Sequence, residues 1–240
     1  MKKILLYSGG MDSWLIDKLW KPDVKLYVDM ETGYSVQERN KLDYTVKQLH
    51  GFNLGQFERK GAIIPLRNAF LVELAILSQM NSNEDLIIGL GSMDGDRCLD
   101  QNPKFAKLIE KLVNHLYEPQ SWTPGKKIKV VLPFKDHTKK ELILEYAKRG
   151  GNVQKAWEES LSCYNPQGEL EEPCWRCKPC VRKWFAFEAA GYQTDKSIRD
   201  KVLASPAVRD MVEKLKAGKT VRSKKEDKDI KMVLEKYKVL

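Results

Sequence analysis

The sequence has no long apolar run. None of its apolar stretches approaches the roughly 20 residues that a membrane-spanning helix needs. No signal-peptide core or cleavage site follows Met1-Lys2-Lys3, which leads directly into a short strand-like segment. The chain also has no internal repeat and no low-complexity linker. These absences predict a cytoplasmic protein without a membrane segment, and 240 residues are enough for one large α/β domain with an appendage.

Acidic residues are fewer than basic ones, and the imbalance is concentrated near the end of the chain. The sequence has 42 Lys and Arg against 33 Asp and Glu, a net charge of +9, and residues 201–240 contribute twelve basic against six acidic side chains. A basic tail can attract nucleic acid, but lysine-rich amphipathic helices are more often solvated faces. Direct nucleic-acid binding is therefore an alternative that the sequence does not favour.

Strand-like and helix-like segments alternate along most of the chain. We expect strands at residues 3–7, 25–29, 53–59, 85–89 and 128–132, and helices at residues 12–20, 36–50, 68–80, 103–117 and 138–150. In the tail, a helix is expected at 206–216 and a last amphipathic turn or two near 233–237. This alternation predicts a mostly parallel sheet with helices on both faces, in which ligands bind beyond the carboxyl ends of the strands. The loops at 8–13, 29–32 and 89–96 should then meet over one crevice.

The first of these loops has the composition of a phosphate-binding turn, formed by Ser8, Gly9, Gly10, Met11, Asp12 and Ser13. Glycines allow close approach of an anion to backbone N–H groups at a helix N-terminus, and Asp12 could ligate a bridging Mg²⁺. No lysine follows the glycines, which excludes the G-x-x-x-x-G-K-[ST] loop. The stretch resembles the SGGxDS signature of the PP-loop ATP pyrophosphatases. An ordinary strand-to-helix turn is the alternative.

Four of the five cysteines lie close together with the spacing C-x10-C-x2-C-x2-C: Cys163, Cys174, Cys177 and Cys180. Four thiolates complete a closed tetrahedral Zn²⁺ site, which would be structural because no position is left for a substrate. An iron–sulfur cluster is the main alternative, and four unrelated free thiols are another. Cys98 is left over, and an incidental thiol is favoured there over a catalytic one.

Together, the loop and the cysteines resemble the 7-cyano-7-deazaguanine synthase (QueC/ExsB) family of PP-loop ATP pyrophosphatases. The resemblance covers roughly residues 1–190. Further segments that carry it are Ile64-Pro65-Leu66-Arg67-Asn68, Val130-Val131-Leu132-Pro133 with Thr138-Lys139-Lys140-Glu141, Ser162-Cys163-Tyr164-Asn165, and Cys174 to Arg182.

This resemblance implies an α/β fold of the PP-loop (adenine nucleotide alpha hydrolase-like) type, a parallel five-stranded sheet with helices on both faces. A PP-loop domain would occupy residues 1–160, a zinc-binding segment 161–192, and a basic helical extension 193–240. The implied reaction converts 7-carboxy-7-deazaguanine and ammonia to the nitrile through an acyl adenylate, with release of AMP and pyrophosphate. ATP, Mg²⁺ and a structural Zn²⁺ would take part, and the protein would be a homodimer.

The resemblance also suggests functional residues. Residues 8–13, with Asp29 and Gly89, would bind the nucleotide, and Asp12 and Ser13 would act in catalysis. Arg67 and Lys139 would neutralise charge as the leaving group departs, although a helix cap and a solvated lysine are their alternatives. The substrate would contact four residues: Arg67, Asn68, Asp94 and Asp100.

Three stretches depart from the family pattern. Leu66 replaces a glycine, residues 92–100 lose the aromatic positions of a segment expected to line the base pocket, and residues 29–33 differ after the second strand. The alternative function is therefore a PP-loop enzyme that adenylates a related deazapurine, another carboxylate or a tRNA base. A nucleic-acid-binding protein with a zinc knuckle, in which Trp175 and neighbouring basic residues form a stacking platform, is a third hypothesis.

Overall fold

A computed structural model of the chain describes residues 1–59, 62–96, 98–165 and 172–240. It divides into two compact units, which are described separately. Unit 1 comprises Met1–Ser92 and Asp96–Lys135, and unit 2 comprises Met93–Gly95 and Asp136–Leu240. The sequence groups residues 136–160 with the PP-loop domain, whereas the compact units group them with the cysteine segment. No helix among the described residues is long and apolar enough to cross a membrane.

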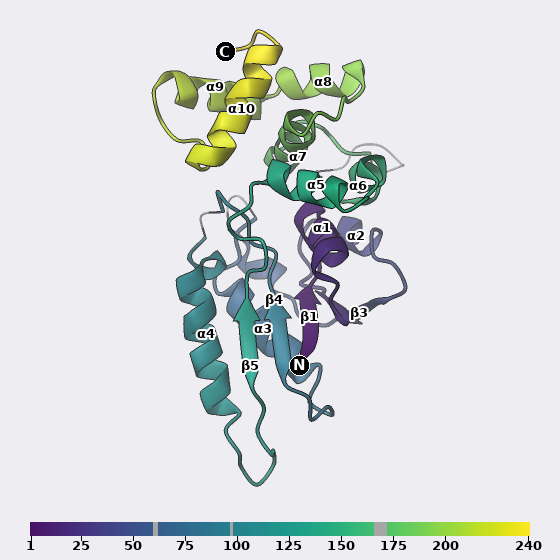
Figure 1. Ribbon diagram of the computed structural model, residues 1–240, viewed down its shortest axis with the longest axis vertical. Coiled ribbons are helices and arrows are strands. Elements are labelled where there is room, and N and C mark those ends of the chain that lie inside the picture. Colours follow the sequence, from purple (N-terminus) through teal and green to yellow (C-terminus); the bar gives the residue numbers. More distant parts are fainter. Residues whose placement is uncertain (60–61, 97, 166–171) are drawn as a thin grey trace. The chain divides into compact units, whose positions relative to one another are not determined.

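Unit 1 contains a five-stranded parallel sheet with the order β3-β2-β1-β4-β5 (Figure 1). The strands are β1 (Lys2–Leu6), β2 (Val24–Val28), β3 (Val46–Leu49), β4 (Leu86–Gly89) and β5 (Ile128–Val131). The helices of this unit are α1 (Met11–Trp20), α2 (Ser35–Arg39), α3 (Arg67–Leu77) and α4 (Pro103–Leu116), with 3-10 turns η1 (Gly55–Phe57) and η2 (Leu99–Gln101). The predicted α/β class and parallel sheet are confirmed.

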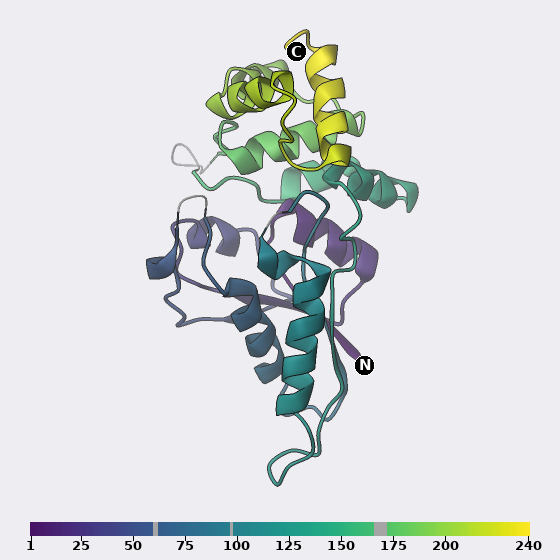
Figure 2. The ribbon, with the colours of Figure 1, turned by 90° about the vertical axis from the view of Figure 1, so that its left-hand side faces the viewer.

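Helices cover both faces of the sheet, and the inner strands β1, β2 and β4 carry its buried apolar residues. Ile4, Leu26 and Ile88 alternate with residues of the opposite face and share one core with α3 and α4, which lie together on their side of the sheet (Figure 2). The opposite face is covered by α1. There, a Cβ on Gly89 would lie 2.6 Å from the ring of Trp20, so a glycine at the end of β4 allows α1 to pack closely on the sheet.

Two of the predicted elements were wrong. Only Ser35–Arg39 of the helix expected at 36–50 is helical, and Val46–Leu49 forms β3, paired with β2 from Lys25↔Val46 to Val28↔Leu49. Asp43 interrupts the helix, because its carboxylate accepts the Thr45 N–H at 2.8 Å and forms an Asx turn. Pairing with β2 then outweighs the helical spacing of the apolar residues.

The strand expected at 53–59 is also absent. This stretch contains the 3-10 turn η1, and the Gly55 N–H donates to the carbonyl of Met30 at 2.8 Å. The edge strand beside β2 is therefore β3, which lies earlier in the chain than the stretch 53–59 that the sequence pattern indicated. The reason is again the β2 edge, where β3 takes the backbone hydrogen bonds.

Unit 2 contains six described helices: α5 (Lys139–Lys148), α6 (Val153–Glu159), α7 (Lys178–Ala189), α8 (Lys196–Leu203), α9 (Pro206–Lys216) and α10 (Lys224–Lys236). Buried side chains of α7, including Trp184, pack with the tail helices in one apolar cluster. Glu188 of α7 also accepts from Lys236 at 2.9 Å and from Tyr237 at 2.7 Å. The tail therefore folds onto α7 and belongs to this unit's core.

Candidate active site and metal centre

The Ser8–Ser13 loop joins the central strand β1 to α1. Gly9 has φ +69°, a left-handed conformation that favours glycine, and Gly10 at the N-cap is extended. No side chain caps this terminus. Since the first-turn amides of a helix have no intrahelical acceptors, they and the positive end of the helix dipole form a site for an anion.

Hydroxyl groups hold the loop in this conformation. Ser13 Oγ accepts from the Ser8 N–H at 3.3 Å and donates to the Gly10 carbonyl at 3.1 Å, and it lies 3.4 Å from Ser8 Oγ. Ser8 Oγ accepts from the Gly10 N–H at 3.3 Å. Ser13 is buried. The two serines named from the sequence are therefore brought together, and the loop is preorganised before any ligand binds.

A second glycine approaches this helix terminus. A Cβ on Gly91 would lie 3.8 Å from the backbone nitrogen of Ser13, so the segment after β4 lies against the first turn of α1. The family resemblance suggested Gly89 for nucleotide contact, whereas Gly89 packs beneath Trp20. Gly91 was missed, and the signal that could have found it is its place two residues beyond the end of β4.

Asp29 follows β2 and is engaged by neighbouring groups. It accepts the Glu31 N–H at 3.0 Å, pairs with the guanidinium of Arg39, and lies 3.6 Å from His50 Nδ1. Burial alone would raise the pKa of Asp29, but hydrogen bonds from Glu31, Ser35 and Arg39 together lower it. An ionised carboxylate therefore stands at this edge of the sheet.

Asn68 and Asp100 were both named as substrate residues, and they contact each other. The Asn68 N–H donates to Asp100 Oδ2 at 3.3 Å, and its side-chain amide donates to the Asp100 carbonyl at 3.0 Å. The N-cap residue of α3 is Leu66, which makes no side-chain cap. Asp100 therefore caps α3 from a distant part of the chain, a structural role that sequence reasoning missed.

Lys139 and Asp94, two further predicted residues, belong to unit 2. Lys139 opens α5 directly after a capping box in which Thr138 and Glu141 bond reciprocally, at 2.7 and 3.2 Å. Lys139 is 7% exposed, so it differs from the solvated lysine considered as its alternative. The Asp94 carboxylate accepts from the Ser223 hydroxyl at the start of α10.

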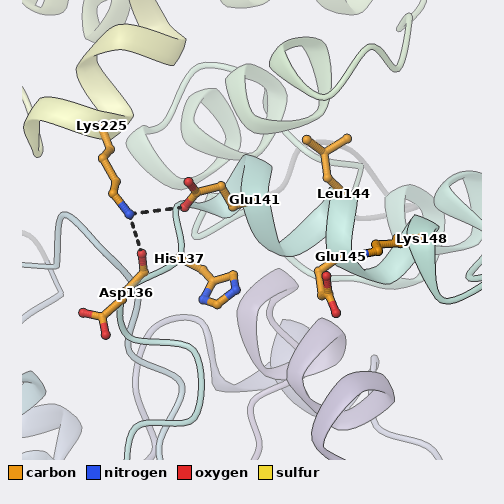
Figure 3. A pocket seen from close by; sticks show the side chains of 7 residues that line it. All are labelled: Asp136, His137, Glu141, Leu144, Glu145, Lys148 and Lys225. Carbon is orange, nitrogen blue, oxygen red and sulfur yellow. Dashed lines mark hydrogen bonds and ion pairs between the residues drawn. The ribbon is translucent and has the colours of Figure 1, made fainter.

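A hollow of about 360 Å³ lies beside α5 in unit 2 (Figure 3). Its lining mixes carboxylates, lysines, a histidine and a leucine: Asp136, His137, Glu141, Leu144, Glu145, Lys148 and Lys225. Lys225 reaches across its rim, with Nζ 3.0 Å from the Asp136 carbonyl and 3.9 Å from Glu141. Charges of both signs line this hollow, so it lacks the uniformly positive character of a phosphate site.

The four clustered cysteines meet in unit 2. One sulfur from each of Cys163, Cys174, Cys177 and Cys180 lies within 4.8 Å of the others. Zinc–sulfur bonds of about 2.3 Å in a tetrahedron require sulfurs about 3.8 Å apart, so the set fits such an ion. Hydrogen bonds from the Cys177 and Cys180 thiols and from two backbone amides lower the pKa of Cys163.

Trp175 lies within this cysteine segment and is buried. Its ring stacks on Trp157 with centroids 4.9 Å apart and an 8° angle between the planes. A base-stacking platform needs an exposed ring face, and Trp175 is buried against Trp157, so this packing argues against the nucleic-acid hypothesis, which relied on Trp175. The segment is held instead by aromatic packing and by its thiols.

Comparison with known proteins identifies the family. The family model for the queuosine biosynthesis protein QueC matches residues 46–191. This chain is a member of the QueC family. The match spans both units and includes all four clustered cysteines, and it begins after the Ser8–Ser13 loop.

Several curated relatives of this QueC family member are named 7-cyano-7-deazaguanine synthase. The protein of Leptospira interrogans (serovar copenhageni) is 26% identical over 79% of this chain and 88% of its own length. That of Chlorobaculum parvum is 24% identical over 80% and 93%, and that of Pyrococcus abyssi is 27% identical over 63% and 61%. The resemblance stated from the motifs is confirmed at the level of the family.

Proposed function

We propose that this chain is an ATP-dependent carbon–nitrogen ligase that converts 7-carboxy-7-deazaguanine and ammonia to 7-cyano-7-deazaguanine. Family membership and the shared name of the relatives support the proposal. One observation carries it. The N-terminus of α1 is uncapped, lies next to Gly9 and the two serine hydroxyls, and follows the carboxyl end of the central strand. This arrangement suits a pyrophosphate group.

The chemistry requires two activations by ATP. A carboxylate is a poor electrophile, so its oxygen first attacks the α-phosphate of ATP to give an acyl adenylate and pyrophosphate. Ammonia then displaces AMP and forms the amide, with loss of a proton. In the second round the amide oxygen attacks the α-phosphate of another ATP and displaces pyrophosphate, and that oxygen then leaves with AMP while the nitrogen loses its two protons and the nitrile forms. Positioning and charge stabilisation carry most of such catalysis.

The residues of this chain would divide these tasks. The backbone amides and hydroxyls of residues 8–13 would hold the phosphates, and Asp12 would help to hold Mg²⁺, which neutralises phosphate charge when it is bound. Arg67 and Lys139 would offset the charge of the departing group. Asn68, Asp94 and Asp100 are proposed to contact the substrate, and Asp29 and Gly89 to lie near the nucleotide.

The cysteine cluster would bind one structural Zn²⁺. Its four sulfurs fit a closed tetrahedral site, and Cys163 and Cys180 are buried in the apolar cluster of unit 2. An ion held by four protein ligands leaves no position for substrate, so its contribution would be to stability. The family resemblance also supports a homodimer, which sedimentation equilibrium would measure directly.

The function is tested by supplying the purified protein with 7-carboxy-7-deazaguanine, ammonium and Mg-ATP. We expect two AMP and two pyrophosphate for each nitrile formed. Release of ADP, or AMP formation that does not depend on the acid, would contradict the proposal. One AMP for each amide product would contradict the nitrile step, and turnover of another acid from a panel, with none of this one, would favour the alternative substrate.

A variant pair sharpens this test. Asp12→Asn should lose turnover at least about 100-fold while keeping its zinc content and circular dichroism, because only the loop carboxylate changes. Asp17→Asn on the same helix is the matched control, since Asp17 pairs with Lys18 at 2.8 Å away from the loop. Equal activity in the two variants would contradict a role for Asp12.

A further inference from the structure

Three residues, Met93–Gly95, group with unit 2, although the chain on either side of them belongs to unit 1. Asp94 is fixed there through three different groups. Its N–H donates to the His137 carbonyl at 2.9 Å, its carbonyl accepts from Arg182 Nη2 at 3.5 Å, and its carboxylate accepts from the Ser223 hydroxyl. Both the backbone and the side chain of Asp94 are therefore held.

An ion pair orients the arginine that contacts the Asp94 carbonyl. Arg182 of α7 binds Glu226 of α10 through two nitrogens, Nε at 2.6 Å and Nη2 at 2.7 Å. The two side chains are 15% and 8% exposed. A planar, two-point contact of this kind fixes orientation as well as distance. Arg182 is therefore aimed at the Asp94 carbonyl by Glu226.

The N-terminus of α10 is part of the same network. Ser223 is its N-cap and accepts the Glu226 N–H at 3.1 Å while it donates to Asp94. Gly95 leaves room for the pair, since a Cβ there would lie 2.5 Å from Glu226 Oε2. The C-terminal helix is thus joined to one short loop by a cap, a carboxylate and an ion pair.

The position of this loop in the chain gives the contacts their significance. Asp94 comes three residues after Gly91, which lies against the first turn of α1 at Ser13. The loop follows β4, and β1 and β4 flank the point where the strand order reverses. Ligands of open parallel sheets bind at that point, beyond the carboxyl ends of the strands.

We propose that Ser223 and Glu226 of the C-terminal extension are positioning residues, which act through Asp94 and Arg182 to set the segment after β4 for binding of the acid substrate. This inference rests on the proposed function. It assigns the tail a part in substrate affinity, a task that its amphipathic, lysine-rich sequence does not suggest. The effect should fall on the KM for the acid more than on the KM for ATP.

The competing explanation is that Ser223 only caps α10, and the chain contains a matched control for it. Ser205 is the N-cap of α9 in the same unit, is buried, and accepts the Val208 N–H at 3.3 Å. Ser205→Ala and Ser223→Ala each remove one cap, but only the second removes a bond to Asp94. Ser223→Asp keeps a capping acceptor and removes the hydroxyl donor, and Ser223→Thr keeps both.

Two measurements on the full-length variants test the inference. In hydrogen–deuterium exchange, peptides containing residues 93–95 should exchange at least about tenfold faster in Ser223→Asp and Ser223→Ala than in the wild type or Ser205→Ala. In steady-state kinetics, the first two variants should raise the KM for the acid at least about tenfold with the KM for ATP changed less than about twofold. Ser223→Thr should restore both values.

Equal effects of Ser223→Ala and Ser205→Ala on exchange at residues 93–95 and on the KM for the acid would show that Ser223 acts only as a cap, and would overturn the inference. Unchanged exchange at 93–95 in Ser223→Asp would also overturn it. Since exchange is measured without substrate, it separates failure of this inference from failure of the proposed function, which would appear as absent acid-dependent turnover in the wild type. Glu226→Gln, which keeps the side-chain shape and weakens the ion pair, should reproduce the exchange result more weakly.

Discussion

The hydroxyl of Tyr27 donates to Glu38 Oε2 at 3.2 Å inside unit 1, where both side chains are buried. Burial raises the pKa of Glu38 to about 7, although the hydrogen bond from Tyr27 and the charge of Arg67 act in the opposite direction. Burial also raises the pKa of Tyr27. A buried carboxyl that titrates near neutrality links the stability of this unit to pH.

Glu38→Gln should flatten the dependence of stability on pH. The ordinary pKa of this carboxyl is 4.5 and its folded value is about 7, so the native state keeps a proton that the unfolded state releases between them. The contribution of Glu38 is therefore complete below pH about 4.5 and is lost as the pH rises through about 7, by about 3 kcal/mol.

Urea denaturation at several pH values measures this effect. The wild type should lose stability across the window from pH 4.5 to 7, and Glu38→Gln should not. Glu73→Gln is the control, because Glu73 is an exposed glutamate of α3. A decline of the same size in all three proteins would contradict the assignment to Glu38.

Loss of one clustered thiol should remove the metal. Cys174→Ser is expected to lower bound zinc from about one equivalent to a small fraction and to destabilise the protein by several kcal/mol, because three thiolates cannot close the site. Elemental analysis and thermal unfolding give the two numbers. Cys98→Ser, outside the cluster, should change neither. Bound iron with visible absorption in the wild type would favour an iron–sulfur cluster instead.

Gly9→Ala should weaken the binding of ATP. A side chain at φ +69° costs about 1 kcal/mol or more, and its Cβ would lie 3.2 Å from Lys41 Cβ, so the turn before α1 must shift. We expect the KM for ATP to rise at least about tenfold in steady-state kinetics. The Kd for a nonhydrolysable ATP analogue, measured by calorimetry, should rise by a similar factor. Gly33→Ala, which has nothing within 4 Å of its Cβ position, should bind like the wild type; equal loss in both would contradict the role of the loop.

Leu66→Gly should stabilise the protein. Leu66 has φ +62° in the left-handed region and is 80% exposed, so glycine relieves backbone strain while little apolar contact is lost. The expected gain is about 1 kcal/mol in the free energy of unfolding, measured by denaturant titration. Leu99→Ala is the control, since Leu99 is 85% exposed and its loss should change stability by less than about 0.5 kcal/mol. A destabilised Leu66→Gly would show that the leucine side chain makes a contact that stabilises the fold.

The sequence alone determined those features that depend on local pattern and composition. The strand before Ser8 and the helix after Gly10 follow from an apolar run and a glycine turn, and the capping box at Thr138 follows from spacing within one turn of helix. The cysteine site follows from spacing too, because C-x2-C pairs bring thiols together over short loops. The motifs also identified the family.

Tertiary structure decided the features that depend on partners distant in the chain. Residues 46–49 became a strand because the edge of β2 offered hydrogen bonds, although their own spacing favours a helix. Asp100 became the cap of α3 across 32 residues, and Ser223 became the partner of Asp94 across 129. No periodicity or spacing encodes such pairs, since each depends on where the packed core brings two chain segments together.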